Sequence, residues 1–198
     1  MRYIKLLDRI NRDTVIKIDG RTEYEYTFGT EKWEIIMGIM IDYMSVIGDL
    51  YGKYEEISEE EAFKLIEKKR KIYNNNLEYA EMLLSNSDNH QRIEEIKEFA
   101  DSFEELEYKI AAVLYKLIDY RIIEKEKLND SCLDPKLVYG VKHLLKDNEQ
   151  SIDEYLELVR SNTIATCVKI KELENLILDE KDKNIIDKYK SYIDFLCE

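Results

Sequence analysis

The feature that most limits the fold of this chain is its scarcity of glycine and proline. The 198 residues include 6 Gly and 1 Pro, and these are the residues that most often form tight turns or interrupt helices. An all-β fold with many short strands needs more of both. The sequence therefore favours long helices. Because hydrophobic residues make up 44% of it, it also favours a packed core over general disorder.

The first part of the chain departs from this helical pattern. Residues 14–18 (TVIKI) and 21–28 (RTEYEYTF) flank Asp19-Gly20, which is typical of a β-hairpin. A three-residue loop would place Ile16 opposite Tyr24 and thereby set the register of the hairpin.

Two further strands are predicted before residue 58. In residues 33–44, side chains of one face of a strand would all be apolar or aromatic. These are Trp33, Ile35, Met37, Ile39, Ile41 and Tyr43. A helix would also stack several apolar side chains of this segment, but its isoleucines and Gly38 favour a strand. Residues 49–57 are predicted to form the last strand.

After residue 58, apolar side chains three and four residues apart predict about five helices. Capping boxes at Ser58 and Ser151 mark two helix starts, and Asp134-Pro135 marks a third. Residues 90–125 predict one long helix, antiparallel to the preceding helix at 58–84. Residues 151–177 predict another continuous helix, and the last helix lies near 186–196. The two heptad rows of the long helix are Ile96, Phe103, Ile110 and Leu117, and Phe99, Leu106, Val113 and Tyr120.

The predicted fold class is therefore α+β, predominantly α. A small N-terminal antiparallel β-sheet (1–57) precedes a bundle of about five helices (58–198) that includes a long antiparallel helical hairpin. No segment rich in Gly, Ser or Pro separates the two parts, so they are expected to share one core.

The net charge of the chain limits the kinds of partner that it is expected to bind. Acidic residues number 43 against 30 basic ones, which gives a net charge of −13. Direct binding to nucleic acid or to anionic membranes is disfavoured, because both usually require a basic surface. Three cysteines without a CxxC motif are typical of reduced thiols, and no apolar run reaches the length of a membrane span. We therefore expect a cytoplasmic protein.

The motifs of common catalytic and metal sites are absent from the sequence. Residues 48–53 (GDLYGK) fall one residue short of a phosphate-binding loop and lack the required Ser or Thr. His90 and His143 are not in metal-binding spacing, and we expect His90 to be exposed and His143 to be structural. The sequence indicates no general base that could activate Cys167 as a nucleophile, so Cys167 is expected to be a buried small side chain. No catalytic residue, cofactor or metal is predicted.

The pair Thr163 and Thr166 interrupts an otherwise aliphatic helix face. These hydroxyls could line a small pocket. The expected alternative is that they bond back to the preceding helical turn and pack as valine would.

One acidic stripe carries the functional prediction. Glu94, Glu98, Asp101 and Glu105 would lie along one side of the long helix, away from its apolar rows. The stripe is interpreted in three ways: a solvated and partly paired face, a surface that binds a protein or mimics DNA phosphates, or a metal site. A basic run at 68–71 (KKRK) would face Asp101, Glu104 and Glu105 across the hairpin, which favours the partly paired face.

We hypothesise that the protein is a small acidic cytoplasmic inhibitor, of the immunity, anti-restriction or anti-CRISPR type, that binds a protein with a basic surface. Such a protein would not be an enzyme. The alternative is a structural or assembly protein that self-associates through its heptad helices. A third hypothesis places an undetected catalytic site between sheet and bundle, lined by Tyr24, Tyr26, Trp33 and Tyr43. The preferred alternative is that these aromatic residues form the core of the sheet.

Overall fold

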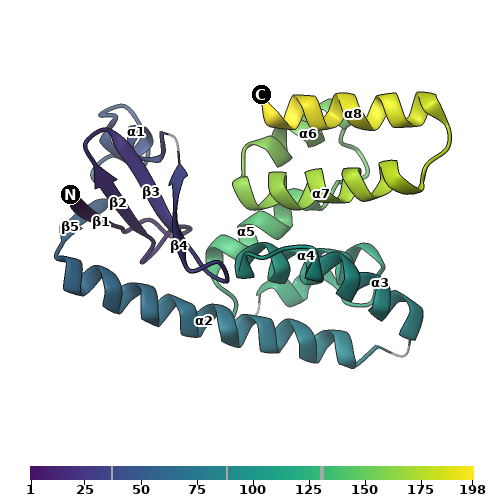
Figure 1. Ribbon diagram of the computed structural model, residues 1–198, viewed down its shortest axis with the longest axis horizontal. Helices are drawn as coiled ribbons and strands as arrows, with labels where there is room; N and C mark the ends of the chain where they lie inside the picture. Colours follow the sequence, from purple (N-terminus) through teal and green to yellow (C-terminus); the bar gives the residue numbers. More distant parts are fainter. Residues whose placement is uncertain (37, 88, 130–131) are drawn as a thin grey trace.

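The computed structural model describes residues 1–36, 38–87, 89–129 and 132–198. Figure 1 shows an antiparallel sheet at one end of the molecule and layers of helices at the other, with α2 (Glu59–Ser85) running beneath both. This arrangement confirms the predicted fold class, α+β and predominantly α.

The sheet has five strands in the order β4-β3-β2-β1-β5, and each neighbouring pair is antiparallel. β1 lies between β2 and β5 and was not predicted from the sequence, because its short segment RYIKL carries no turn signal before it. The strands are β1 (Arg2–Leu6), β2 (Val15–Asp19), β3 (Thr22–Thr27), β4 (Lys32–Ile36) and β5 (Tyr54–Ile57).

The predicted hairpin is present, but its predicted register is wrong by one residue. Lys17, and not Ile16, lies opposite Tyr24, and Asp19 pairs with Thr22. The loop therefore contains only Gly20 and Arg21. Gly20 has φ +62°, and a glycine at the first central position suits the tightest hairpin turns. The Lys17 ammonium consequently lies over the Tyr24 ring, 4.4 Å from its centroid.

The predicted strand at 33–44 is correct only in its first half. β4 ends at Ile36, and α1 (Ile39–Met44) follows. Gly38 has φ +76°, a left-handed conformation that ends the extended backbone before α1 begins. Met37, which the strand prediction placed on the same face, lies outside the described residues.

Seven α-helices follow β5 in the described part of the chain. Both predicted capping boxes are confirmed, with Ser58 bonded to Glu61 and Ser151 to Glu154. Asp134 caps α5 and accepts a hydrogen bond from the Lys136 backbone N–H. After α2, the helices are α3 (His90–Asp101), α4 (Leu106–Asp119), α5 (Pro135–Leu144), α6 (Ile152–Arg160), α7 (Thr163–Asp179) and α8 (Lys183–Cys197), with a 3-10 turn at Lys125–Asn129.

The prediction of one continuous helix over 90–125 is wrong. The chain leaves helical geometry between α3 and α4, where the Leu106 backbone N–H donates to the Phe28 carbonyl oxygen at 2.6 Å. A side chain at Gly29 would meet the Glu104 carbonyl oxygen at 2.2 Å. The turn that follows β3 therefore lies against the interhelix segment, and a long-range contact holds the break.

The predicted continuous helix over 151–177 is also broken, between α6 and α7. The Asn162 side chain caps α7 by accepting a hydrogen bond from the Ala165 N–H at 3.0 Å. Thr166 Oγ1 donates to the Val159 carbonyl oxygen at 3.0 Å, so this hydroxyl satisfies a carbonyl near the end of α6.

Buried apolar side chains of the described residues form two clusters. The larger one joins Tyr3, Val15 and Phe28 of the sheet region to residues of α2 and of the later helices. The smaller one lies on the other side of the sheet and includes Ile4, Ile16 and Tyr43. Division of the chain at residue 57 stays a prediction, but sheet and helices share the larger cluster.

Candidate functional sites

The helix break divides the predicted acidic stripe. Glu94, Glu98 and Asp101 are exposed on α3, whereas Glu105 is half-buried just before α4. Asp101 accepts a hydrogen bond from Lys109 Nζ at 2.5 Å. Glu94 and Glu98 make no ion pair within the described residues. Partner binding by this stripe stays a prediction.

The basic run at 68–71 does not face the acidic stripe, so that predicted pairing is wrong. Lys68 Nζ lies 2.7 Å from the Asp13 carboxylate, and Arg70 bonds to Glu31 and to Glu67. Asp13 and Glu31 belong to the loops of the sheet. The basic residues of α2 thus hold the sheet, because the sheet lies over this half of the helix (Figure 1).

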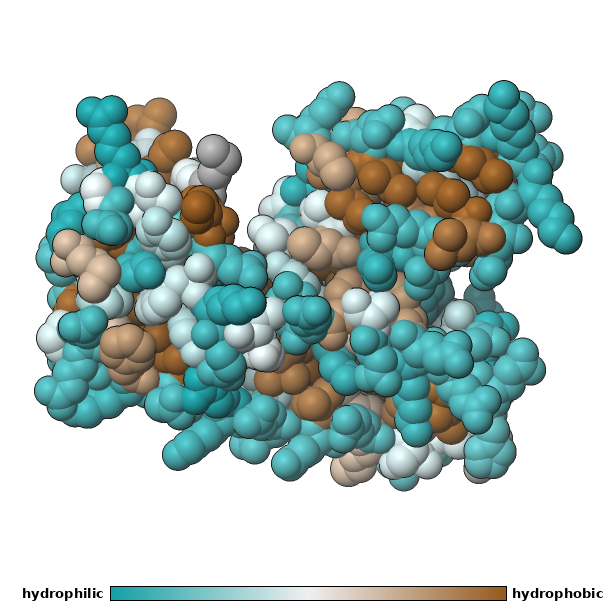
Figure 2. Space-filling model, in the orientation of Figure 1, coloured by the Kyte–Doolittle hydropathy of each residue, from teal (hydrophilic) through white to brown (hydrophobic). Residues whose placement is uncertain are grey.

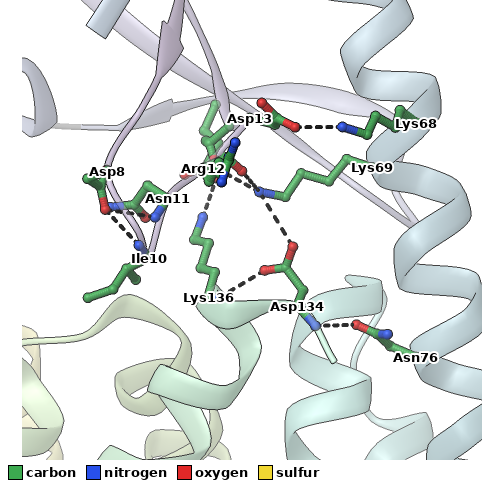
Figure 3. Close-up of polar contacts among 12 residues, drawn as sticks. Asp8, Ile10, Asn11, Arg12, Asp13, Lys68, Lys69, Asn76, Asp134 and Lys136 are labelled. Atoms are coloured by element: carbon green, nitrogen blue, oxygen red, sulfur yellow. Dashed lines mark hydrogen bonds and ion pairs between the residues drawn. The ribbon is translucent and has the colours of Figure 1, made fainter. Parts of the chain in front are cut away.

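A buried polar network joins the sheet, α2 and α5 (Figure 3). Lys69 Nζ donates to Thr14 Oγ1 at 2.8 Å and to the Arg12 carbonyl oxygen at 3.2 Å, and it lies 3.8 Å from the Asp134 carboxylate. Burial lowers the pKa of Lys69, and Asp134 opposes that shift. Lys136 also bonds to Glu25 of β3. Each buried ammonium therefore has a carboxylate beside it, as burial of charge requires.

Two more side chains complete this junction. Asn76 Oδ1 accepts from the Asp134 backbone N–H at 2.9 Å, and its amide donates to the Cys132 carbonyl oxygen at 2.6 Å. Glu107 is buried, and its Oε2 has no hydrogen-bond partner within the described residues. Burial raises the pKa of Glu107 to about 7, so this carboxyl group titrates near neutral pH.

The junction brings carboxylates and ammonium groups together, but it has little room for a substrate. The cavity beside Lys69 and Glu25 has a volume of about 10 Å³, which suits a single water molecule. Tyr26 lines this cavity, and Trp33 contacts the Tyr26 ring. Tyr43 lies on the other side of the sheet, where it donates to Asp8. Tyr24 and Trp33 both lie under the Lys17 ammonium. Three of the four aromatic residues proposed to line a catalytic site therefore lie together, and Tyr43 lies apart from them.

The remaining candidate residues have structural contacts. His90 is exposed, and buried His143 bonds through Nδ1 to the Tyr139 carbonyl oxygen at 2.8 Å. Cys167 is half-buried, and its thiol lies near the Tyr108 side chain. Thr163 is exposed, whereas the Thr166 hydroxyl bonds back to the end of α6.

The most exposed apolar group among the described residues was missed by the sequence interpretation. Ile47 is 94% exposed, Val46 74% and Ile41 68%, and Met44 and Tyr51 are also exposed. These five side chains, in α1 and the segment after it, are called the α1 surface. Figure 2 shows brown side chains at this free end of the sheet lobe. The concentration of these apolar residues between positions 41 and 51 could have indicated a surface. However, the alternation of apolar side chains over residues 33–44 predicted the buried face of a strand.

Other features of the described residues add no site. None of the helices described here is long and apolar enough to cross a membrane. No group of three or more His, Cys, Asp or Glu side chains in the described ranges is placed to hold a metal ion.

Comparison with known proteins identifies no relative: no protein-family model matches the chain, and neither a curated protein nor a solved structure matches it.

Proposed function

We propose that this protein binds another protein through the α1 surface, and that the partner presents an apolar patch flanked by basic residues. The exposure of Ile41, Val46 and Ile47 carries the proposal. Single exposed apolar side chains are common, but a concentration of them is typical of an interaction site.

The charge around the α1 surface supports a basic partner. The chain segment that contains the α1 surface, residues 34–56, has one basic side chain, Lys53, and five acidic ones, of which Glu55 pairs with Lys5 of β1. The acidic residues are Glu34, Asp42, Asp49, Glu55 and Glu56. Together with the net charge of −13, this local excess would speed encounter with a basic surface and disfavour acidic partners.

The acidic stripe has a secondary part in this proposal. Figure 1 places α1 and α3 at opposite ends of the molecule. A typical interface buries about 800 Å² on each partner, so one compact partner would contact one of these ends. Glu94 and Glu98 would then act mainly through the long-range field of the protein.

More specifically, the protein would inhibit the partner that it binds. A basic surface that binds nucleic acid would be covered by the acidic protein, and the nucleic acid would be excluded. Self-assembly through heptad helices has lost its motivating feature, because α3 and α4 are separate helices. Self-association through the α1 surface is an outcome that the experiment below would reveal.

The test compares three baits in lysate from the native host. They are the wild type, the triple variant Ile41→Ser, Val46→Ser and Ile47→Ser, and the control Leu178→Ser. Leu178 lies on α7 and is 81% exposed, so the control removes a similar apolar side chain elsewhere. We expect one stoichiometric partner on the wild type and the control, and its loss from the triple variant.

Two outcomes would contradict the proposal. Equal recovery of the partner on all three baits would place the interface elsewhere. Absence of any stoichiometric partner at low salt, combined with a wild-type dimer that the triple variant cannot form, would indicate self-association instead.

A further inference from the structure

A second candidate site lies among the C-terminal helices, away from α1. It is a cleft of about 560 Å³ bounded by α4, the end of α5, α6, α7 and α8. Its size falls in the range of small-molecule sites, about 300–1,000 Å³. We call it the C-terminal cleft and define it by Tyr115, Tyr155, Lys169, Leu173, Tyr189 and Tyr192.

The deep wall of the C-terminal cleft is apolar and held in place. Leu144, Leu156 and Leu173 line it and are buried. The Tyr155 hydroxyl donates to the Leu144 carbonyl oxygen at 2.9 Å, and the Tyr115 hydroxyl donates to the Glu172 carboxylate at 3.2 Å. These bonds fix the two rings, so the wall is formed before any ligand arrives.

The mouth of the cleft retains unused hydrogen-bond donors. Tyr189 and Tyr192 are half-buried, and neither hydroxyl bonds to another group in the described part of the chain. A ligand in the cleft could therefore accept a hydrogen bond from either hydroxyl.

The charge of the cleft differs from that of the whole protein. Three lysines line it, Lys125, Lys146 and Lys169, against two acidic residues, Asp119 and Asp147. This local excess of positive charge occurs in a chain whose net charge is −13.

Only one of the three lining lysines is neutralised by a carboxylate. Lys169 Nζ lies 2.6 Å from Glu172, a carboxylate that is shared with Lys116. Lys125 and Lys146 have no carboxylate within ion-pair distance among the described residues, although Lys146 Nζ contacts two backbone carbonyl oxygens. The exposed rim thus carries two ammonium groups and the Asp147 carboxylate beside an apolar wall, while the second lining carboxylate, Asp119, pairs with Lys116. One positive charge of the rim is therefore left over.

We propose that the C-terminal cleft binds a small organic carboxylate with an apolar body. The body would pack against Leu173 and the tyrosine rings. The carboxylate would lie at the rim, near Lys125 and Lys146. This activity is independent of partner binding by the α1 surface.

The test uses two probes that share an apolar body and differ in charge. Decanoate and decyltrimethylammonium are titrated separately into the protein by calorimetry, below the concentrations at which they form micelles. We expect decanoate to bind one molecule per chain, about tenfold more tightly than the cation. Equal affinities, or no decanoate binding tighter than about 1 mM, would overturn the proposal.

Variants then locate the binding. Lys125→Gln with Lys146→Gln should weaken decanoate binding about fivefold. Lys183→Gln with Lys190→Gln makes the same charge change on α8 at exposed lysines outside the lining, and it should leave the affinity unchanged. The triple serine variant of the α1 surface should also bind decanoate normally. An unchanged affinity in the Lys125 and Lys146 variant, or loss of binding in the α1 variant, would place decanoate elsewhere.

Discussion

The two sides of the sheet are covered in very different ways. On one side, Tyr3 and Val15 pack in a cluster that continues through α2 into the later helices. On the other side, Ile4 and Ile16 pack in a small separate cluster beneath α1. The first covering helix has 27 residues and the second has 6. Among its 27 residues α2 leaves only Phe63 and Met82 as exposed large apolar side chains, whereas α1 leaves Ile41 and Met44 exposed among six residues. The exposed Val46 and Ile47 follow directly after α1.

The polar groups that fasten these two coverings also differ. On the α2 side, Lys69 connects the sheet to Asp134 at the start of α5. On the α1 side, the Tyr43 hydroxyl donates to Asp8 and accepts from Asn11 Nδ2 at 3.0 Å. The α2 side is thus fastened by two ion pairs, Lys69 with Asp134 and Lys136 with Glu25. On the α1 side, the Tyr43 hydroxyl joins the short helix to Asp8 and Asn11.

The largest expected effect comes from Lys69 on the α2 side. Lys69→Met leaves the buried Asp134 carboxylate without its ammonium neighbour, and loss of such a partner costs about 3–5 kcal/mol. Urea denaturation should show this loss in the free energy of unfolding. Lys71→Met is the matched control, because Lys71 is exposed, and it should change stability by less than about 0.5 kcal/mol. Similar losses in both variants would mean that the junction is not held by Lys69.

The next effect is a pH dependence at the same junction. Burial raises the pKa of Glu107 from its ordinary 4.5 to about 7 in the folded protein. The folded state therefore holds the proton more tightly, and this stabilising contribution is full below about pH 4.5 and lost as pH rises through about 7. Glu107→Gln removes the titration. The free energy of unfolding of the variant, relative to that of the wild type, should rise by on the order of 3 kcal/mol from pH 5 to pH 8.

Thermal or urea unfolding at several pH values measures that difference directly. Other titrating groups occur in both proteins and cancel in the comparison. A stability difference that stays constant from pH 5 to pH 8 would show that Glu107 does not titrate in this range.

A smaller and more local effect is expected on the α1 side. Tyr43→Phe removes the hydroxyl that donates to Asp8, and an unsatisfied buried acceptor costs about 1–3 kcal/mol. Hydrogen exchange should speed up mainly at the backbone amides of α1. If the rate of hydrogen exchange rose equally in α1 and α2, the two sides of the sheet would instead open together.

The sequence predicted those parts of the fold whose causes are local. Ser58 and Glu61 are three residues apart and cap α2 whatever lies beyond, and Asp134-Pro135 marks the start of α5 in the same way. The break between α3 and α4 could not be predicted, because it depends on the Phe28 carbonyl oxygen, far away in the chain. The heptad pattern continues through that break and therefore suggests one helix.

The candidate sites show the same limit. Ile41 and Tyr43 share a face on a strand, but in α1 one is exposed and the other buried. Apolar residues alone therefore could not reveal which would form a surface. The C-terminal cleft gathers side chains from several helices, and no sequence spacing records their convergence. The acidic stripe was visible in the sequence, but its continuity required a helix that does not form.

The smallest expected effect concerns this stripe, which belongs to neither side of the sheet. Glu94→Gln with Glu98→Gln removes two like charges spaced four residues apart on α3. Such repulsions cost about 0.2–0.5 kcal/mol, so the double variant should be slightly more stable at low salt, and the gain should shrink as salt is added. A clear loss of stability would reveal a structural partner for these carboxylates.

Covalent labelling of two methionines tests the central claim most directly. Met44 belongs to the α1 surface and is 44% exposed, while Met82 lies on α2 and is 48% exposed. In the dilute purified protein, the two should therefore oxidise at similar rates. In lysate of the native host, binding of a partner to the α1 surface should slow oxidation of Met44 severalfold and leave Met82 unchanged. Unchanged oxidation of Met44 relative to Met82 in that lysate would contradict the proposal that the α1 surface binds a partner.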